Sequence, residues 1–225
     1  MSWHLMKEVE RLRKQILTLC SLVEQSVEKA VLSVSRRDER LAMEVVRDDD
    51  QIDQMEVDVE EECLKILALH QPVAADLRYV VAILKINNDL ERIGDLAVNI
   101  AEQAVYFTQA PPLNMPYDYA GMAAKVRAML RHSLDAMINL DENLAQCVLT
   151  SDDEVDKLHA EMYGLVQDSI RKQPEYMDLF IRMLSVSKNL ERIADYATNI
   201  AEDVVYMIRG KIVRHHCQEP GKPQS

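Results

Sequence analysis

The sequence predicts an all-α protein made of two tandem, pseudo-symmetric three-helix bundles. Three observations lead to this fold class. First, only five Gly and two Phe occur in 225 residues, while residues that lose little entropy in a helix, such as Ala, Leu, Glu and Met, are abundant. Second, the apolar residues recur at helical spacing and not in alternation. Third, one segment is repeated. With 48% hydrophobic residues, the chain can bury a core.

The repeat is strongest between residues 90–106 (LERIGDLAVNIAEQAVY) and residues 190–206 (LERIADYATNIAEDVVY). These segments share 12 of 17 residues at an offset of 100. Residues 49–53 (DDQID) echo residues 152–156 (DDEVD) at an offset of 103. The chain therefore reads as a tandem duplication. Turns must absorb the drift in offset, because a two-residue loss inside a helix would rotate its face by about 200°.

In the first copy, periodic segments over residues 6–36, 39–69 and 73–107 predict three helices. The charged Arg36-Arg37-Asp38 turn separates the first two helices, and Pro72 suits the first helical position of the third. We expect the same pattern in the second copy, with breaks near Ser151 and Pro174. Long helices joined by tight turns run antiparallel, so each copy should form an up-down-up bundle.

Three prolines within residues 111–116 mark the boundary between the copies, because proline lacks the amide donor that a helix needs. We expect a first domain over residues 1–110, a Pro-rich linker over 111–116, a second domain over 117–210 and a C-terminal tail over 211–225. The tail contains His215-His216-Cys217. Adjacent residues on a frayed tail rarely converge on one metal ion, so we assign it no site.

The composition excludes several functions. A net charge of −12 argues against a general nucleic-acid binder, which needs clustered Lys and Arg. No apolar run approaches the roughly 20 residues of a membrane span, and the N-terminus lacks an export signal, so we expect a cytoplasmic protein. The scattered Cys20, Cys63, Cys147 and Cys217 fit reduced thiols. No nucleotide-binding loop, nucleophile elbow or HExxH motif occurs, so we expect no enzymatic activity.

A helical wheel of the repeated segment separates a core stripe from an oxygen-bearing stripe. The core stripe comprises Leu90, Ile93, Ala97, Ile100, Ala101 and Ala104. The other stripe lies well away from it on the wheel. It comprises Glu91, Asp95, Asn99 and Glu102 in the first copy, and Glu191, Asp195, Asn199 and Glu202 in the second.

Glu and Asp four residues apart on a helix repel each other by about 0.2 to 0.5 kcal/mol unless a cation lies between them. Magnesium, manganese and iron favour such oxygen ligands, so the stripe predicts metal ligands, with further ligands from another helix. For a single Glu–Asp pair, the alternative interpretation is an acidic face that only contacts solvent. Here, however, the same residue types recur at the same helical positions in both copies. Other carboxylates, Asp53, Glu56 and Glu60, are weaker candidates. Their counterparts Asp156, His159 and Tyr163 match only in part, so the two sites could differ.

The two LERI(G/A)D-x-A-x-NIAE segments, QPVAADLR at residues 71–78 and RGKIVRH at residues 209–215 resemble the PhoU family. The resemblance implies two three-helix bundles and cytoplasmic, negative control of phosphate uptake and of the phosphate-starvation response. It implies a phosphate ABC importer and a sensor histidine kinase as partners, with membrane association only through them, and we expect a homodimer.

In some PhoU proteins the E(D)xxxD motifs bind iron, zinc or similar ions, whereas other members are metal-free. The motifs map onto Glu91, Asp95, Glu191 and Asp195, with the Asn and Glu residues of the stripe adjacent. The metal itself is not readable from the sequence. The competing interpretations are a carboxylate-based metal-storage or metal-dependent redox protein, and a plain helical scaffold.

Overall fold

The computed structural model describes residues 3–111, 117 and 119–210. This part of the chain is helical and contains no strand, which confirms the predicted fold class. The elements in order are α1 (Trp3–Arg36), α2 (Glu39–His70), α3 (Ala74–Gln109), α4 (Tyr119–Asn139), α5 (Glu142–Lys172), the 3₁₀ turn η1 (Pro174–Tyr176) and α6 (Met177–Arg209).

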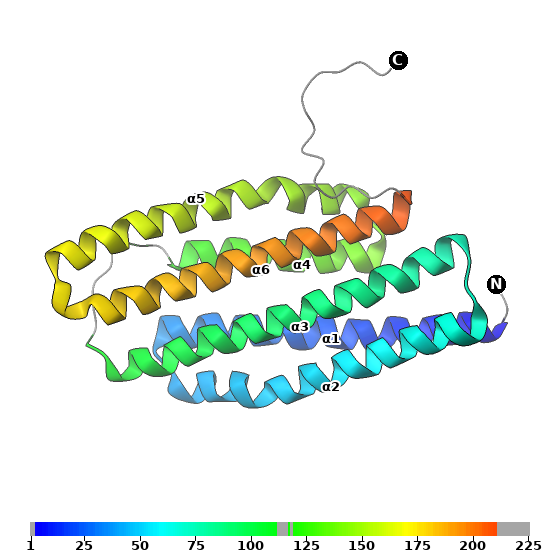
Figure 1. Cartoon of the computed structure of the whole chain (residues 1–225), viewed down its shortest axis with the longest axis horizontal. Helices are drawn as coiled ribbons and strands as arrows, with labels where there is room; N and C mark the ends of the chain where they lie inside the picture. Colours follow the sequence, from blue (N-terminus) through cyan, green and yellow to red (C-terminus); the bar gives the residue numbers. More distant parts are fainter. Residues whose placement is uncertain (1–2, 112–116, 118, 211–225) are drawn as a thin grey trace, which may run out of the picture.

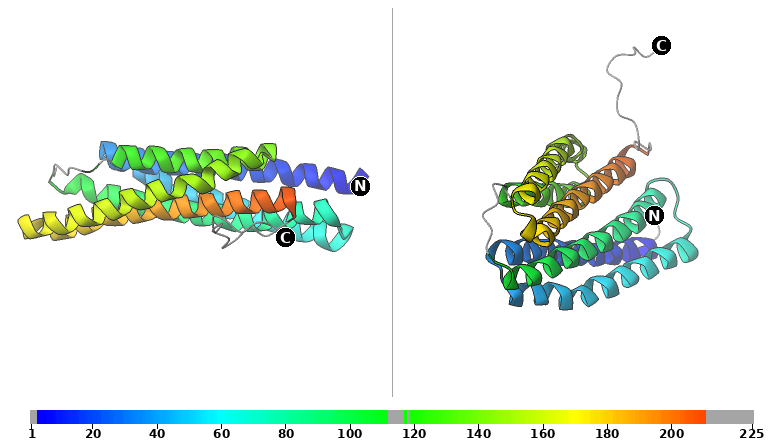
Figure 2. Two further views of the ribbon diagram at one scale, coloured as in Figure 1. Left: turned by 90° about the horizontal axis from the view of Figure 1, so that it is seen from above. Right: turned by 60° about the vertical axis from the view of Figure 1, so that its left-hand side comes forward.

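The six helices form two three-helix bundles that lie side by side, α1 to α3 in one and α4 to α6 in the other (Figure 1). Within each bundle, consecutive helices run antiparallel, as the short turns require. The contact between the bundles is made mainly by α3 and α6, with a smaller contribution from α1 and α4. The repeated segments therefore pack against each other where the two bundles meet, as the right-hand view of Figure 2 shows.

The first turn of each copy is built in the same way. Asp38 accepts a hydrogen bond from the backbone N–H of Leu41 and caps α2, and Asp141 accepts from the N–H groups of Asn143 and Leu144 and caps α5. A capping carboxylate satisfies amides that the first helical turn leaves without partners. The residue before each cap has a positive φ, 53° at Arg37 and 50° at Leu140, which turns the chain back.

The predicted break near Ser151 is wrong. Ser151 lies inside α5, and its hydroxyl donates to the carbonyl of Cys147 one turn earlier. A serine can make this bond without interrupting the helix. The boundary between α4 and α5 lies instead at Leu140 and Asp141, where the positive φ of Leu140 directly precedes the cap Asp141. This position stands 103 residues after the Arg37-Asp38 turn.

The prolines at the other turns differ in their roles. Pro174 opens η1, close to the predicted break. Pro72 does not begin α3, because the extended Val73 precedes the helix and Ala74 is its first residue. Gln71 and Ala74 both have positive φ values, 44° and 50°, so the chain reverses within the residues that flank Pro72. The expected helix start is therefore displaced by two residues, within the usual uncertainty of helix ends.

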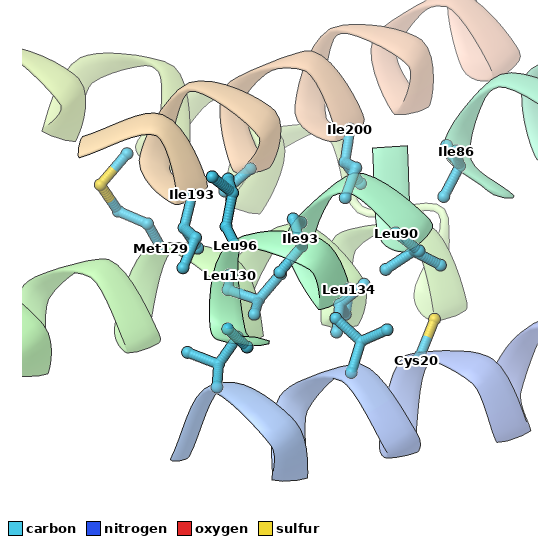
Figure 3. Close-up of a cluster of buried hydrophobic side chains, with 14 of the residues drawn as sticks. Cys20, Ile86, Leu90, Ile93, Leu96, Met129, Leu130, Leu134, Ile193 and Ile200 are labelled. Atoms are coloured by element: carbon cyan, nitrogen blue, oxygen red, sulfur yellow. The ribbon is translucent and has the colours of Figure 1, made fainter. Parts of the chain in front are cut away.

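The larger of two hydrophobic clusters in the described residues runs through both bundles, and a smaller one in the second bundle consists of Met162, Val166 and Phe180. All six residues of the predicted core stripe are fully buried. In Figure 3, Leu90 and Ile93 of α3 lie between α1 and α6, and Ile193 and Ile200 approach them from α6. Burying an aliphatic side chain of this size stabilises the fold by about 1.5 to 3 kcal/mol. The two copies consequently share a core, and each depends on its neighbour for part of its burial.

Polar contacts bind α3 to α6 at two places. The ammonium of Lys85 on α3 lies 3.3 Å from the buried carboxylate of Asp203 on α6, and above the ring of Tyr206. At the second place the cation comes from α6 and the ring from α3. The guanidinium of Arg182 on α6 lies 3.9 Å from the ring centroid of Tyr106 on α3. Tyr106 and Tyr206 occupy equivalent positions in the two copies. The pseudo-symmetry of the sequence thus recurs in the contact between the bundles.

Three of the four cysteines fall within the described residues, and all three are free thiols, buried at Cys20 and Cys63 and exposed at Cys147. Cys217, the neighbouring histidines and most of the Pro-rich linker lie outside the described residues. Among the helices that the structure describes, none has a stretch long and apolar enough to cross a bilayer.

Candidate metal centres

The first acidic cluster lies between α2 and α3 and consists of Asp49 and Asp53 on α2 with Glu91 and Asp95 on α3. Residues four apart on one helix lie on the same face, so each helix presents two carboxylates to the other. The carboxylate of Asp49 packs against Gly94, where an added β-carbon would lie 3.3 Å from Oδ1. Burial, followed by the charges of Asp53 and Asp95, raises the pKa of Asp49 to about 6.

The second acidic cluster occupies the equivalent place between α5 and α6. Oxygen atoms of Asp152, Asp156 and Asp195 lie within 4.8 Å of one another, a spacing that one metal ion can span. Burial, and then the charges of Glu191 and Asp152, raise the pKa of Asp195 to about 6. These shifts record first the cost of burying a carboxylate and then the cost of placing several negative charges together.

Each cluster contains a buried oxygen that accepts no hydrogen bond from the described residues: Oδ1 of Asp49 in the first and Oδ1 of Asp152 in the second. Buried polar atoms are nearly always satisfied in proteins, by a protein group, water or an ion. A cation bound between the helices would satisfy both atoms and neutralise the clustered carboxylates. The donor set therefore fits a hard or borderline metal ion such as magnesium, manganese, iron or zinc.

Basic side chains already offset part of this charge. Arg92 contacts Glu91 at 3.3 Å and Asp95 at 3.1 Å. In the second copy, Lys188 pairs with Glu191. Arg92 and Lys188 are both about half exposed, so these pairs are screened by solvent and contribute little stability. They would compete only weakly with a divalent ion.

The structure brings together four of the predicted ligands, Glu91 with Asp95 and Glu191 with Asp195, and corrects the expected environment of the two glutamates. All four were expected well away from the core, and the side chain of Asp95 is indeed 43% exposed and Asp195 is exposed. The side chain of Glu91 is only 23% exposed and that of Glu191 only 14%, because α2 and α5 pack over that side of the repeated helices. The wheel described a single helix and contained no information about this neighbour.

The other four predicted ligands are separated from this arrangement. Asn99 and Glu102 are exposed on α3, beyond Asp95. Asn199 and Glu202 line a cleft of about 870 Å³ between the bundles, together with Glu56, Glu60, Leu84, Lys85, Asn88 and Asp89. Residues of both copies line this cleft, and most of its charged side chains are negative. None of the carboxylates of the second cluster lines it.

Helices α2 and α5 contribute more carboxylates to these clusters than the sequence alone indicates. Asp53 and Asp156 were weak candidates, and Asp49 and Asp152 served only to establish the repeat. The signal that could have identified them was present: residues 49–53 and 152–156 each contain a D-x-x-x-D pair, with the same four-residue spacing as the E-x-x-x-D pairs. Two such pairs on antiparallel neighbours bring four carboxylates to the same place in each copy, and among the described residues Asp152, Asp156 and Asp195 come close enough to share one ion.

The chain is similar to known proteins over nearly its whole length. A family model described as PhoU domain matches it twice, at residues 16–104 and 120–204. A relative from Aquifex aeolicus (strain VF5), named phosphate-specific transport system accessory protein PhoU homolog, is 37% identical, and the match covers 97% of this chain and 99% of the relative. A relative of the same name from Pseudomonas putida is 36% identical, with 92% of this chain and 82% of the relative covered.

Solved structures show the same fold. The crystal structure of PhoU from Pseudomonas aeruginosa superposes with a TM-score of 0.87 at 36% identity, covering 91% of this chain and 99% of that one. The phosphate transport system regulatory protein PhoU from Streptococcus pneumoniae gives a TM-score of 0.83 at 28% identity, covering 93% of this chain and 99% of that one.

Proposed function

Because this chain belongs to the PhoU family, we propose that it is a negative regulator of phosphate uptake and of phosphate-starvation signalling that works by binding other proteins. The observation that carries the proposal is the match of both copies to the PhoU domain, over the same length as relatives named for the phosphate-specific transport system. We infer a cytoplasmic homodimer whose partners are the phosphate ABC importer and a sensor histidine kinase.

The surface of the first bundle supports a role in protein contact. Exposed apolar side chains occur at the start of α1 and at the α2–α3 turn, elements that meet at one end of the bundle (Figure 1). Trp3 is 61% exposed, Leu69 68% and Val73 73%. Exposed apolar side chains at one end of the bundle are the part of this surface that we propose contacts a partner protein, because a gathered apolar surface favours protein binding.

We further propose that the two carboxylate clusters bind divalent metal ions. Asp49, Asp53, Glu91 and Asp95 would hold metal in the first copy, and Asp152, Asp156, Glu191 and Asp195 in the second. A bound ion supplies positive charge that cancels the repulsion among these carboxylates. It would cross-link α2 to α3 and α5 to α6, so that the relative position of these helices depends on metal. The helix faces that meet partners would then respond to metal occupancy.

The regulatory proposal is tested by deleting the gene and measuring a phosphate-starvation reporter in high phosphate. We expect derepression of the reporter, and its repression should return when the wild-type chain is supplied. A strain that keeps the reporter silent and takes up phosphate normally would contradict the regulatory role. The metal-storage alternative would then give the better account of the carboxylate clusters.

A further inference from the structure

The cleft between the bundles carries more negative charge than its own cation balances. The charged residues of its described lining are one lysine and four acidic residues: Lys85, Glu56, Glu60, Asp89 and Glu202. The ammonium of Lys85 pairs with Asp203, which does not line the cleft. Among the described residues, no basic side chain forms an ion pair with Glu56, Glu60 or Glu202. The cleft therefore offers carboxylates to a cation from elsewhere.

A buried amide holds Glu56 on the wall of this cleft. Nδ2 of Asn87 donates to Oε1 and to the backbone carbonyl of Glu56, both at 2.9 Å, and Asn87 is only 1% exposed. Oδ1 of the same amide accepts no hydrogen bond from the described residues. Burial, followed by the charge of Glu60, raises the pKa of Glu56. The wall thus combines a positioned carboxylate with an unsatisfied acceptor, and a cationic N–H donor is the group that both lack.

The excess charge is specific to one side of the molecule. In the second copy, each acidic residue that the first copy contributes to the cleft is replaced by a residue without negative charge: Glu56 by His159, Glu60 by Tyr163 and Asp89 by Asn189. The duplication by itself therefore does not account for the acidic lining. The lining is a property of the face that α2 and α3 share with α6.

Helix α6 ends close to this face. Glu202 lies eight residues before Gly210, a distance of about 12 Å along the helix. Gly210 has a φ of 69°, and its N–H donates to the carbonyl of Tyr206, a geometry that ends a helix and redirects the chain. A β-carbon at Gly210 would lie 3.4 Å from the guanidinium of Arg78 on α3. The chain therefore leaves α6 against α3, which also lines the cleft, and Figure 1 shows these two helix ends together.

The residues that follow are basic. The segment of residues 211–216 (KIVRHH) contains Lys211, Arg214 and two histidines but no acidic residue, in a chain whose net charge is −12. Six extended residues span up to about 20 Å, which exceeds the distance of about 12 Å from Gly210 back to Glu202. The segment is thus long enough to bring Arg214 to the cleft.

We propose that the segment of residues 211–216 binds in the acidic cleft, with the guanidinium of Arg214 on the carboxylates of Glu60 and Glu202. A guanidinium pairs with carboxylates through several N–H donors at once. The bound segment connects α6 of the second bundle to α2 of the first, and it competes with any cationic segment of a partner protein for the same carboxylates. The inference requires neither the proposed metal binding nor the regulatory role.

The test uses Cys217, which directly follows the segment, in the full-length chain. Cys147→Ser removes the exposed thiol of α5, and a nitroxide spin label is then attached to Cys217 of ¹⁵N-labelled protein. Compared with the reduced label, the nitroxide should broaden the amide signals of residues 84–89 more than those of residues 142–146. The second region also lies beside the end of α6, where Glu142 pairs with Arg209. A segment that is only tethered at Gly210 would broaden both regions alike.

Charge variants separate binding from mere proximity. Glu60→Gln with Glu202→Gln should abolish the excess broadening at residues 84–89. NaCl at about 1 M should do the same, because it shortens the Debye length to about 3 Å. Glu161→Gln with Glu175→Gln, the matched control, removes the same charge from exposed positions outside the cleft and should leave the broadening unchanged. Arg214→Glu should abolish the excess broadening, and adding Glu202→Lys should restore it.

Equal broadening of both regions in the otherwise wild-type chain would overturn the proposal, as would excess broadening that persists in Glu60→Gln with Glu202→Gln. A mixture of spin-labelled ¹⁴N chains with unlabelled ¹⁵N chains gives one more outcome. Broadening of residues 84–89 in that mixture would place the segment in the cleft of a second copy and overturn its binding to its own chain. The phosphate-starvation reporter tests the proposed function separately, so each idea can fail alone.

Discussion

At the scale of single residues, the clustered carboxylates decide how this protein responds to metal. Asp95 and Asp195 lie beside acidic partners on the neighbouring helix, and neither is buried in the core. We expect Asp95→Ala with Asp195→Ala to remove most bound metal and to leave the helical circular dichroism spectrum nearly unchanged. Metal is measured by elemental analysis of protein purified without an affinity tag. Glu161→Ala, on an exposed face of α5, is the control. Undiminished metal in the double variant would favour a solvated acidic face.

The same residues predict how stability depends on pH. The pKa of Asp49 rises from 3.8 to about 6 on folding, chiefly through burial and then through the charge of Asp53. A raised carboxyl pKa gives stability that is complete below about pH 4 and is lost as the pH rises through about 6. Metal-free protein should therefore be less stable to urea at pH 7 than at pH 5.

Asp49→Asn should remove part of this loss. We expect it to stabilise the metal-free protein by about 1 kcal/mol at pH 7, a value kept small by solvent screening of a partly exposed group. With metal present the sign should reverse, because the variant loses a ligand. Asp168→Asn, at an exposed ion pair on α5, should show neither effect. If the urea midpoint of the wild-type protein, kept metal-free by a chelator, did not change between pH 5 and pH 7, the prediction would be contradicted.

At the scale of the helices, equivalent caps begin α2 and α5. The carboxylate of Asp141 accepts two backbone amide hydrogen bonds, at 2.9 Å and 3.1 Å, that water would otherwise have to satisfy. Asp141→Ala should lower the free energy of unfolding by about 1 kcal/mol. Ser151→Ala, inside α5, should change it by less than about 0.5 kcal/mol. Urea unfolding distinguishes the two variants. A larger loss of unfolding free energy in Ser151→Ala than in Asp141→Ala would favour a helix break near Ser151.

At the scale of the whole molecule, the contact between α3 and α6 joins the two copies into one unit. Lys85→Ala removes the cation next to Asp203, whose side chain is 3% exposed. We expect a loss of about 1 to 3 kcal/mol, because a buried carboxylate loses a cation that offsets the cost of its burial. Lys125→Ala, which breaks an exposed pair with Glu154, should cost no more than about 1 kcal/mol.

Thermal unfolding should remain a single transition in the wild-type protein, since both bundles share one core. Two separate transitions would show that the copies unfold independently. A loss in Lys85→Ala no greater than in Lys125→Ala would show that the pair between the bundles is as weak as an exposed one.

Sequence by itself determined the features that depend on short stretches of chain. The helices apart from the boundary between α4 and α5, their antiparallel order, the core stripe through Leu90 and Ile93, and the duplication follow from helical periodicity, turn residues and self-similarity. The ExxxD pairs were identified as candidates because residues four apart on one helix are neighbours whatever the tertiary structure.

Only the tertiary structure decided which helices face each other and at what register. It set Asp49 against Gly94, Asp152 beside Asp195 and His159 beside Ser187, and it separated Asn199 and Glu202 into a cleft between the bundles. These pairings depend on the rotation and axial shift of one helix against another. Packing of the complete core fixes both quantities, and the periodicity of a single segment specifies neither.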